Sequence, residues 1–158
     1  MMKPLEIHAR LRGRFGDAVL DWQEPAAGDA SISVAAAKLP EVCRFLREDA
    51  SLQFDYLRLV TGVDRGEVLS SVYHLYSYVH NHDLTLRVDV DRADPRMPSV
   101  VEFWPSADWH EREAYDMMGI VYEGHPNLHR ILLPEDWDGY PLRKDYVAPK
   151  EYHGISNE

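Results

Sequence analysis

The chain has 158 residues, 45% of them apolar and 28% charged, which is the size and composition of one globular domain. Its net charge of −10 argues against nucleic-acid binding, because phosphate contacts need a positive surface, and disfavours adsorption to anionic lipid. A single cysteine, Cys43, excludes an internal disulfide framework and any multi-cysteine metal or iron–sulfur site within the chain. Neither a secretory signal nor an apolar run of roughly 20 residues occurs, so we expect a soluble, intracellular domain without direct membrane insertion.

The N-terminal third predicts two helices and two short strands. Apolar residues at helical spacing predict a helix over residues 5–15, which ends near Gly16. Short strands are expected over residues 18–22 and 31–34. Pro40 suits the first turn of a second helix that runs to about residue 49, with Cys43 as a small buried side chain.

The middle of the chain carries the clearest sheet signal. Alternating and β-branched residues predict strands over residues 57–64, 68–80 and 84–91, joined by turns at 65–67 and 81–83. Together they predict an antiparallel meander. We expect its middle strand to be covered on both faces and its third strand to keep one face in solvent.

The last third begins with a loop over residues 94–98 and a short helical stretch that Pro105 breaks. A helix over residues 107–118, closed by Gly119, and a strand over residues 120–122 follow. Prolines then recur without a periodic pattern. The predicted fold class is α+β, an antiparallel-rich sheet with helices packed on it and a long irregular C-terminal arm. We expect one α+β domain over residues 1–125 and an extended arm over residues 126–158.

The helix over residues 107–118 carries the densest polar cluster. Asp108, Arg112 and Asp116 recur at every fourth position, flanked by Trp109 and Glu113. One interpretation is a solvated ladder of weak ion pairs, with Arg112 paired within the domain to Asp108 or Asp116. The other is a protein interface, which the large aromatic ring beside an arginine favours.

A metal-dependent hydrolase is the alternative function. His110-Glu111 begins like the zinc motif H-E-x-x-H, but Ala114 stands where the second histidine is needed. A zinc site built from His110, His125 and His129 would be the remaining possibility. No nucleotide-binding loop or nucleophile motif occurs.

The arm is rich in aromatic residues, which disordered tails normally lack. Trp137, Tyr140, Tyr146 and Tyr152 lie in a proline-punctuated stretch, with Arg143 and Lys144 between them. We therefore expect these rings to dock, either on the same domain or on another polypeptide.

Three ordered blocks of this sequence resemble a known family. They are Glu111–Ile120 (EREAYDMMGI), His125–Trp137 (HPNLHRILLPEDW) and Pro141–Tyr146 (PLRKDY). In composition, order and spacing they are similar to the 30-kilodalton-type subunit (C) of NADH:quinone oxidoreductase (respiratory complex I) of the bacterial or plastid type.

The resemblance implies a non-catalytic structural subunit in the hydrophilic arm of a proton-translocating enzyme that transfers electrons from NADH to quinone. It implies that this chain holds no cofactor, whereas NADH, FMN, iron–sulfur clusters and quinone bind to other subunits. The implied neighbours are chiefly the quinone-site subunit (D) and also the iron–sulfur subunits B and I. The implied location is the cytoplasmic side of the inner membrane, or the stromal side for a plastid type.

No catalytic or metal-binding residue is therefore expected, and the candidate residues are interface residues. On the helix they are Trp109, Arg112, Glu113 and Asp116; on the arm they are Arg130, Trp137, Arg143, Lys144 and Tyr146. A soluble adaptor unrelated to respiration remains a third possibility beside the hydrolase.

Overall fold

The fold is that of a computed structural model, which describes residues 2–26 and 28–156. Met1, the expected first residue of the domain, and Asn157 and Glu158, the expected last residues of the arm, lie outside the described residues. The chain begins with α1 (Pro4–Phe15), a 3-10 turn (Gly16–Ala18) and the hairpin strands β1 (Val19–Gln23) and β2 (Ser31–Val34). A second 3-10 turn (Ala36–Lys38) leads into α2 (Leu39–Glu48), which buries Leu39, Val42, Cys43 and Leu46 in the core. These elements begin and end within two residues of their predicted positions.

The predicted meander is confirmed. It consists of β3 (Tyr56–Asp64), β4 (Val68–Ser77) and β5 (His82–Asp91), in a five-stranded sheet of order β1-β2-β5-β4-β3. Within this sheet only β2 and β5 run parallel, and the other neighbours are antiparallel. The fold class α+β, with an antiparallel-rich sheet and helices packed on it, is therefore confirmed.

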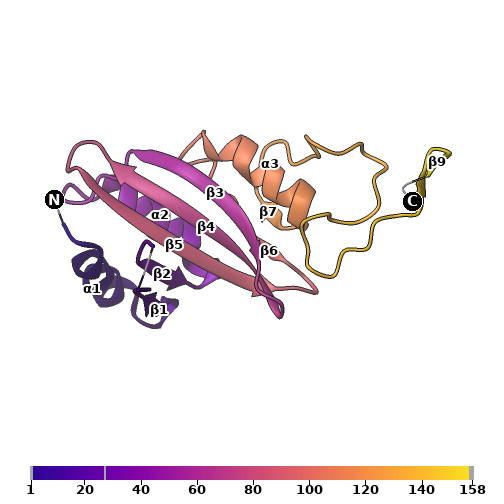
Figure 1. The fold of residues 1–158 in the computed structure, drawn as a ribbon. Helices are drawn as coiled ribbons and strands as arrows, with labels where there is room; N and C mark the ends of the chain where they lie inside the picture. Colours follow the sequence, from indigo (N-terminus) through magenta and orange to yellow (C-terminus); the bar gives the residue numbers. More distant parts are fainter. Residues whose placement is uncertain (1, 27, 157–158) are drawn as a thin grey trace.

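The two faces of the sheet differ in what covers them. Alternate residues of the central strands, such as Tyr73 and Leu86, join the side chains of α2 in one buried core behind the sheet in Figure 1. On the opposite face, Val72 of β4 is only half-buried, so the expected cover on both faces of the middle strand is wrong. The solvent-facing side expected for the third strand is also wrong in part. Thr85 and Arg87 are only 7% exposed, because Arg87 reaches Gln23 of β1 and Thr85 contacts the neighbouring strand.

Residues 94–104 differ from the prediction. Instead of a loop and a helix, the chain forms β6 (Arg96–Pro98), which pairs in parallel with β7 (Val121–Glu123). The pairing continues when the Ser99 N–H donates to the carbonyl oxygen of Glu123 at 2.8 Å. The few residues left before Pro105 form a turn, because a strand and a helix cannot use the same backbone groups.

The helix α3 (Ala107–Met118) occupies its predicted residues and packs on β3, the edge strand of the sheet. The Val60 N–H donates to His110 Nδ1 at 3.2 Å, and the Ser106 hydroxyl donates to the Leu57 carbonyl at 3.2 Å. Gly119 ends the helix in the left-handed conformation, with φ of 73°. A Cβ atom there would lie 2.6 Å from the ring of Tyr140, so glycine is required both by the backbone and by this close approach.

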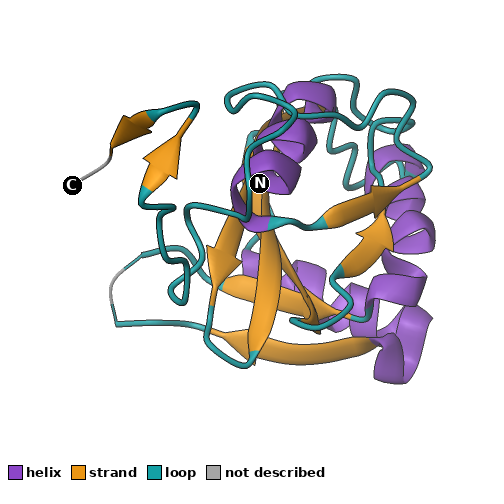
Figure 2. Ribbon diagram, turned by 90° about the vertical axis from the view of Figure 1, so that its right-hand side faces the viewer, coloured by secondary structure: helices purple, strands orange, loops and turns teal. Residues whose placement is uncertain are grey.

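After β7 the chain is irregular until the short hairpin β8 (Glu151–Tyr152) and β9 (Ile155–Ser156). Figures 1 and 2 both show this hairpin standing apart from the five-stranded sheet. The irregular residues 125–150, here termed the C-terminal segment, first return over α3 and only then lead away from it. The division of the chain at residue 125 stays a prediction.

Candidate interaction site

Asp116 on α3 anchors the C-terminal segment. Its side chain is fully buried, and Oδ2 accepts hydrogen bonds from the backbone N–H groups of Ile131, Leu132 and Leu133 at 2.7 to 3.0 Å. Oδ1 accepts from Arg130 Nη1 at 2.9 Å. One carboxylate thus holds four consecutive residues of the segment, which have no secondary structure of their own.

The ionised form of Asp116 suits this position. Burial alone raises the pKa of the carboxyl group, but the hydrogen bonds from Leu132, Leu133, Arg130 and Ile131 favour the anion, and the net pKa is lowered. A buried charge that is paired and fully hydrogen-bonded is far less costly than an isolated one. The charge therefore fixes the segment against the helix at neutral pH.

Arg112 is covered by the same segment, and only 7% of the residue is exposed. Its guanidinium hydrogen-bonds the ring of His129 through Nη2 and lies 3.9 Å from Asp108 Oδ1. It also lies 4.6 Å from the ring centroid of Trp109. The ion pair within the domain is therefore formed with Asp108, whereas Asp116 pairs with Arg130.

Arg130 links the helix to the next turn of the segment. Besides Asp116, it donates through Nη2 to the carbonyl oxygens of Trp137 and Gly139, each at 3.2 Å. The Trp137 indole in turn donates to the Tyr146 hydroxyl at 3.1 Å. Of the predicted residues, Arg130 thus connects the segment to α3 and also to its own later residues. Trp137 and Tyr146 contact each other within the segment.

Arg143 and Lys144 bind the end of α3 and the sheet. Arg143 Nε donates to the Met118 carbonyl at 2.7 Å, and its guanidinium stacks on Tyr140. The Lys144 backbone N–H donates to Asp64 Oδ2 at 2.8 Å, while the lysine side chain is exposed. Through its backbone, the segment is therefore tied to β3 as well as to α3.

Asp64 and Arg92 belong to this anchoring network, although no sequence pattern pointed to them. Arg92 donates to Asp64 at 2.8 Å and also hydrogen-bonds Asp145. The hydrogen bond from Arg92, and next that from the Lys144 N–H, hold the pKa of the Asp64 carboxyl well below its usual range. These residues lie far apart in the sequence, in β3, after β5 and in the segment, and no local pattern marks their proximity.

The outer side of α3 and the C-terminal segment exposes large apolar side chains among charged ones. Four large apolar side chains on α3 and the segment are between 57% and 86% exposed, namely Trp109, Leu132, Leu142 and Val147. Glu113 is exposed beside Trp109. Of the predicted interface residues, α3 thus presents Trp109 and Glu113 to solvent, whereas Arg112 and Asp116 brace the segment from beneath. Large apolar side chains that are exposed on α3 and the segment are candidates for contact with another protein.

Glu111 lies on the core side of α3 and is fully buried. Its carboxylate accepts hydrogen bonds from the Ser99 hydroxyl at 2.6 Å and from the Val100 N–H at 2.8 Å. Burial raises its pKa to about 7, the two hydrogen bonds act in the opposite direction, and the nearby Asp108 charge adds to the increase. Glu111 therefore joins the turn before Pro105 to the helix, and no cation among residues 2–26 and 28–156 pairs with it.

The three histidines of the hydrolase alternative are engaged separately. His110 accepts from the backbone of β3, His125 lies 3.2 Å from the Asp108 carbonyl oxygen, and His129 contacts Arg112. Over residues 2–26 and 28–156, no group of three or more histidine, cysteine, aspartate or glutamate side chains is arranged to hold a metal ion. The zinc site that the alternative requires is not formed by these side chains. In the same described ranges, none of the helices combines the length and the apolar character that crossing a bilayer requires.

Comparison with known proteins identifies a family to which most of the chain is similar. The family described as "Respiratory-chain NADH dehydrogenase, 30 Kd subunit" matches residues 32–152. The NADH-quinone oxidoreductase subunit (C) of Chloroherpeton thalassium is 48% identical over 156 residues, which are 97% of this chain and 65% of the relative. That of Roseiflexus castenholzii is 46% identical over 142 residues, 88% of this chain and 81% of the relative. That of Saccharopolyspora erythraea is 50% identical over 134 residues, 80% of this chain and 54% of the relative.

Two solved structures share the fold. A trypsin-resistant fragment of Nqo5 has a TM-score of 0.65 and 27% identity, and the similarity covers 77% of this chain and 98% of the fragment. A chain of an archaeal membrane-bound sulfane sulfur reductase has a TM-score of 0.73 over 92% of this chain and 86% of that one; at 23% identity it shows the fold alone. This chain spans only about two thirds or less of the length of some curated relatives. With most of its length matched by the family, the chain belongs to the 30-kilodalton subunit family of respiratory-chain NADH dehydrogenases.

Proposed function

We propose that this chain is a non-catalytic structural subunit in the hydrophilic arm of a proton-translocating NADH:quinone oxidoreductase. It holds no cofactor of its own, and NADH, FMN, iron–sulfur clusters and quinone are bound by other subunits. It lies on the cytoplasmic side of the inner membrane, or on the stromal side in a plastid, as a peripheral part of the complex.

Family membership is the observation that carries this proposal, because the matched residues 32–152 include α3 and all of the C-terminal segment. The structure supports it through the use of polar groups. The side chains of Asp116, Arg130 and Arg143 all hydrogen-bond the backbone of the segment or of α3 and so fix the segment against the helix. A segment held rigidly against a helix in this way can serve as a scaffold for a neighbouring subunit.

The partners we propose are the quinone-site subunit (D) and the iron–sulfur subunits B and I. The contacts are made by Trp109 and Glu113 and by the exposed apolar residues of the C-terminal segment. The remaining predicted residues complete the interface, mainly by holding the segment in its binding conformation; they are Arg112, Asp116, Arg130, Trp137, Arg143, Lys144 and Tyr146. A large, preformed apolar surface is expected for a permanent complex, because ordering on binding would cost affinity.

Co-purification tests the proposal. The full chain is produced with an affinity tag in its own cells, and the membranes are solubilised in mild detergent. Proteins that co-purify with the tagged chain are identified by mass spectrometry. We expect subunits B, D and I in stoichiometric amounts with the wild type. We expect their loss with Val147→Asp, because a charge would enter an apolar contact.

Leu5→Asp is the matched control, since Leu5 is also exposed but lies on α1. Retention of all three subunits by Val147→Asp would contradict the proposed interface. Purification without any iron–sulfur subunit would support the soluble adaptor instead. Stoichiometric zinc or manganese that is lost with His110→Ala would support the hydrolase.

A further inference from the structure

The face of the sheet opposite the helical core is open. Leu59 of β3 pairs with His74 of β4, and Thr61 pairs with Val72, so these four side chains lie on one face. Leu59 is 40% exposed and the other three are half-buried. Figure 1 shows no helix in front of this part of the sheet, whereas α2 lies behind it.

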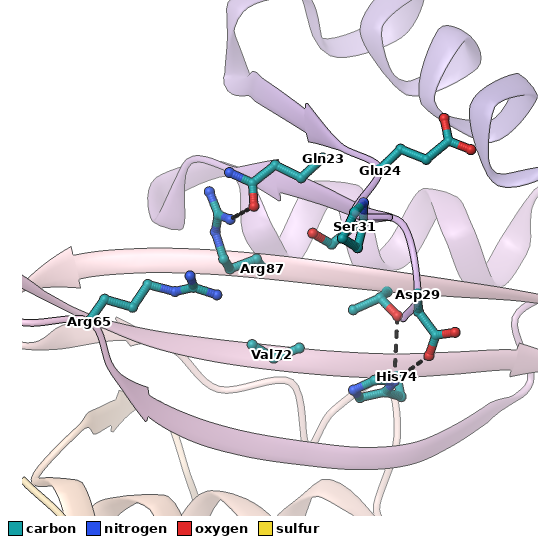
Figure 3. A pocket seen from close by; sticks show the side chains of 10 residues that line it. Gln23, Glu24, Asp29, Ser31, Arg65, Val72, His74 and Arg87 are labelled. Atoms are coloured by element: carbon teal, nitrogen blue, oxygen red, sulfur yellow. Dashed lines mark hydrogen bonds and ion pairs between the residues drawn. The ribbon is translucent and has the colours of Figure 1, made fainter. Parts of the chain in front are cut away.

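A cavity of about 560 Å³ adjoins this open face. Its floor is formed by Val72, His74, Thr85 and Arg87, and its rim by the end of β1, the connection to β2, and Arg65. Figure 3 shows the guanidinium groups of Arg65 and Arg87 directed toward the same end of the cavity. Asp29 and His74 lie at the other end, with Asp29 Oδ2 3.9 Å from His74 Nδ1.

Arg87 is a charged group with unused hydrogen-bonding capacity. Its side chain is only 9% exposed. Nη1 donates to Gln23 Oε1 at 2.6 Å, and Nε lies 3.2 Å from Asp89 Oδ1. That approach does not meet hydrogen-bond geometry, so the buried Nε–H has no acceptor among the described residues. Nη2 also donates to no described residue, and unlike Nε it is not among the fully buried atoms, so it is the nitrogen that an acceptor from outside can reach.

The local charges favour an acid as that acceptor. Asp89 accepts a hydrogen bond from Ser70 at 2.6 Å, and the Ser70 hydroxyl accepts from Arg65 Nε at 3.0 Å, so a single carboxylate serves both arginines. In Figure 3 the Glu24 side chain points away from the two guanidinium groups. At this end of the cavity the two arginines therefore lie near one carboxylate, that of Asp89, and Asp21 approaches Arg87 only through Gln23, whose Nε2 donates to it at 3.1 Å.

We propose that the open face of β3 and β4 and the adjoining cavity form a second docking surface, which takes an Asp or Glu side chain of a neighbouring polypeptide between Arg65 and Arg87. A carboxylate can accept from both guanidinium groups in charge-assisted hydrogen bonds. The apolar side chains of Val72 in the cavity floor and of Leu59, which pairs with His74 beside it, extend the contact surface. A small free anion would leave these two side chains uncovered. This inference rests on the proposed function in that the neighbour is another subunit of the same assembly.

Site-specific photocrosslinking tests this surface in the full chain within cells that assemble it. One form carries p-benzoylphenylalanine at position 59 on the open face, and a second carries it at position 147 in the C-terminal segment. We expect position 59 to crosslink to a different subunit, at a peptide that includes an Asp or Glu. With Arg65→Glu or Arg87→Glu the yield should fall roughly tenfold or more, as expected for a lost hydrogen bond to a charged group. Changing the Asp or Glu of the neighbouring subunit to Lys should restore the crosslinking yield of these arginine-to-glutamate variants.

Arg65 is exposed, so Arg65→Glu keeps the test valid if Arg87→Glu fails to fold. Arg47→Glu on α2 is the control and should leave the yield unchanged. Crosslinking at position 147 but not at 59 would overturn the docking surface and leave the proposed function standing. Crosslinking at neither position would contradict both the docking surface and the proposed function. A crosslink from position 59 to a second copy of this chain, to a peptide without an acid, or with a yield insensitive to both arginine variants would also overturn the inference.

Discussion

The anchoring of the C-terminal segment by Asp116 leads to a quantitative prediction for Asp116→Ala. The substitution removes the acceptor of three backbone N–H groups and leaves Arg130, whose side chain is 14% exposed, without its anion. Removing one partner of a buried charge pair typically costs about 3–5 kcal/mol. Because residues 131–133 have no other regular structure, we expect this cost to appear as local opening of the segment rather than as unfolding of the sheet.

Amide hydrogen exchange measures that opening directly. A loss of about 3–5 kcal/mol corresponds to exchange that is roughly 100- to 4000-fold faster at Ile131, Leu132 and Leu133. Exchange in β4 should stay nearly unchanged. Glu113→Ala is the matched control, because Glu113 is exposed on the same helix. Unchanged protection of residues 131–133 in Asp116→Ala would refute the anchoring role.

Three further substitutions test other parts of the network. The pKa of Glu111 is raised to about 7 from its ordinary value of 4.5, so the folded chain binds more protons than the unfolded chain between these values. Wild-type stability should therefore fall by up to ~3 kcal/mol as pH rises from about 4.5 to 8, and Glu111→Gln should remove this decline in urea titrations at several pH values. Gly119→Ala should cost about 1–2 kcal/mol from the left-handed backbone alone, and more from the clash, whereas Gly13→Ala inside α1 should be neutral or stabilising in the same titrations. The pKa of Asp64 is lowered by Arg92, so its contribution is complete above the ordinary aspartate pKa and is lost as pH falls through the lowered value. Asp64→Asn should thus be clearly less stable than wild type at pH 7, and the difference in melting temperature should narrow below about pH 4.

For each of these three substitutions, one result would contradict the expected effect. A pH profile of Glu111→Gln that parallels the wild type would show that another group controls the decline. Equal stability of Gly119→Ala and Gly13→Ala would contradict the close approach of Tyr140 to the helix end. A stability difference for Asp64→Asn that persists unchanged into acid would show that the carboxylate charge does not hold the segment.

Local patterns were enough to predict the meander and α3. The β-branched runs around the turns at residues 65–67 and 81–83 lead to neighbouring antiparallel strands, and Gly119 marks the end of α3. The parallel pairs β2–β5 and β6–β7 were not predicted, because each joins strands separated by long stretches of chain. Nothing in a local pattern states which distant strand will be the partner.

The interaction site was only partly predictable for a related reason. Helical spacing correctly placed Asp108, Arg112 and Asp116 on one face, and the bulky ring of Trp109 beside them suggested contact with protein. Spacing cannot tell whether solvent, another polypeptide or the chain itself covers that face. The structure shows the chain itself, through backbone N–H groups that carry no sequence signature.

Direct binding to the quinone-site subunit tests the central claim, which is that this chain works as a scaffold through α3 and its C-terminal segment. The full chain and a form that ends at residue 140 are each co-expressed with a tagged quinone-site subunit. The masses of the isolated complexes, and hence their stoichiometry, are measured by native mass spectrometry. We predict a one-to-one complex with the full chain and none with the shortened form, provided that both keep the same folded sheet by circular dichroism. A full-length chain that leaves the quinone-site subunit unbound, or a shortened chain that binds it equally well, would contradict the claim.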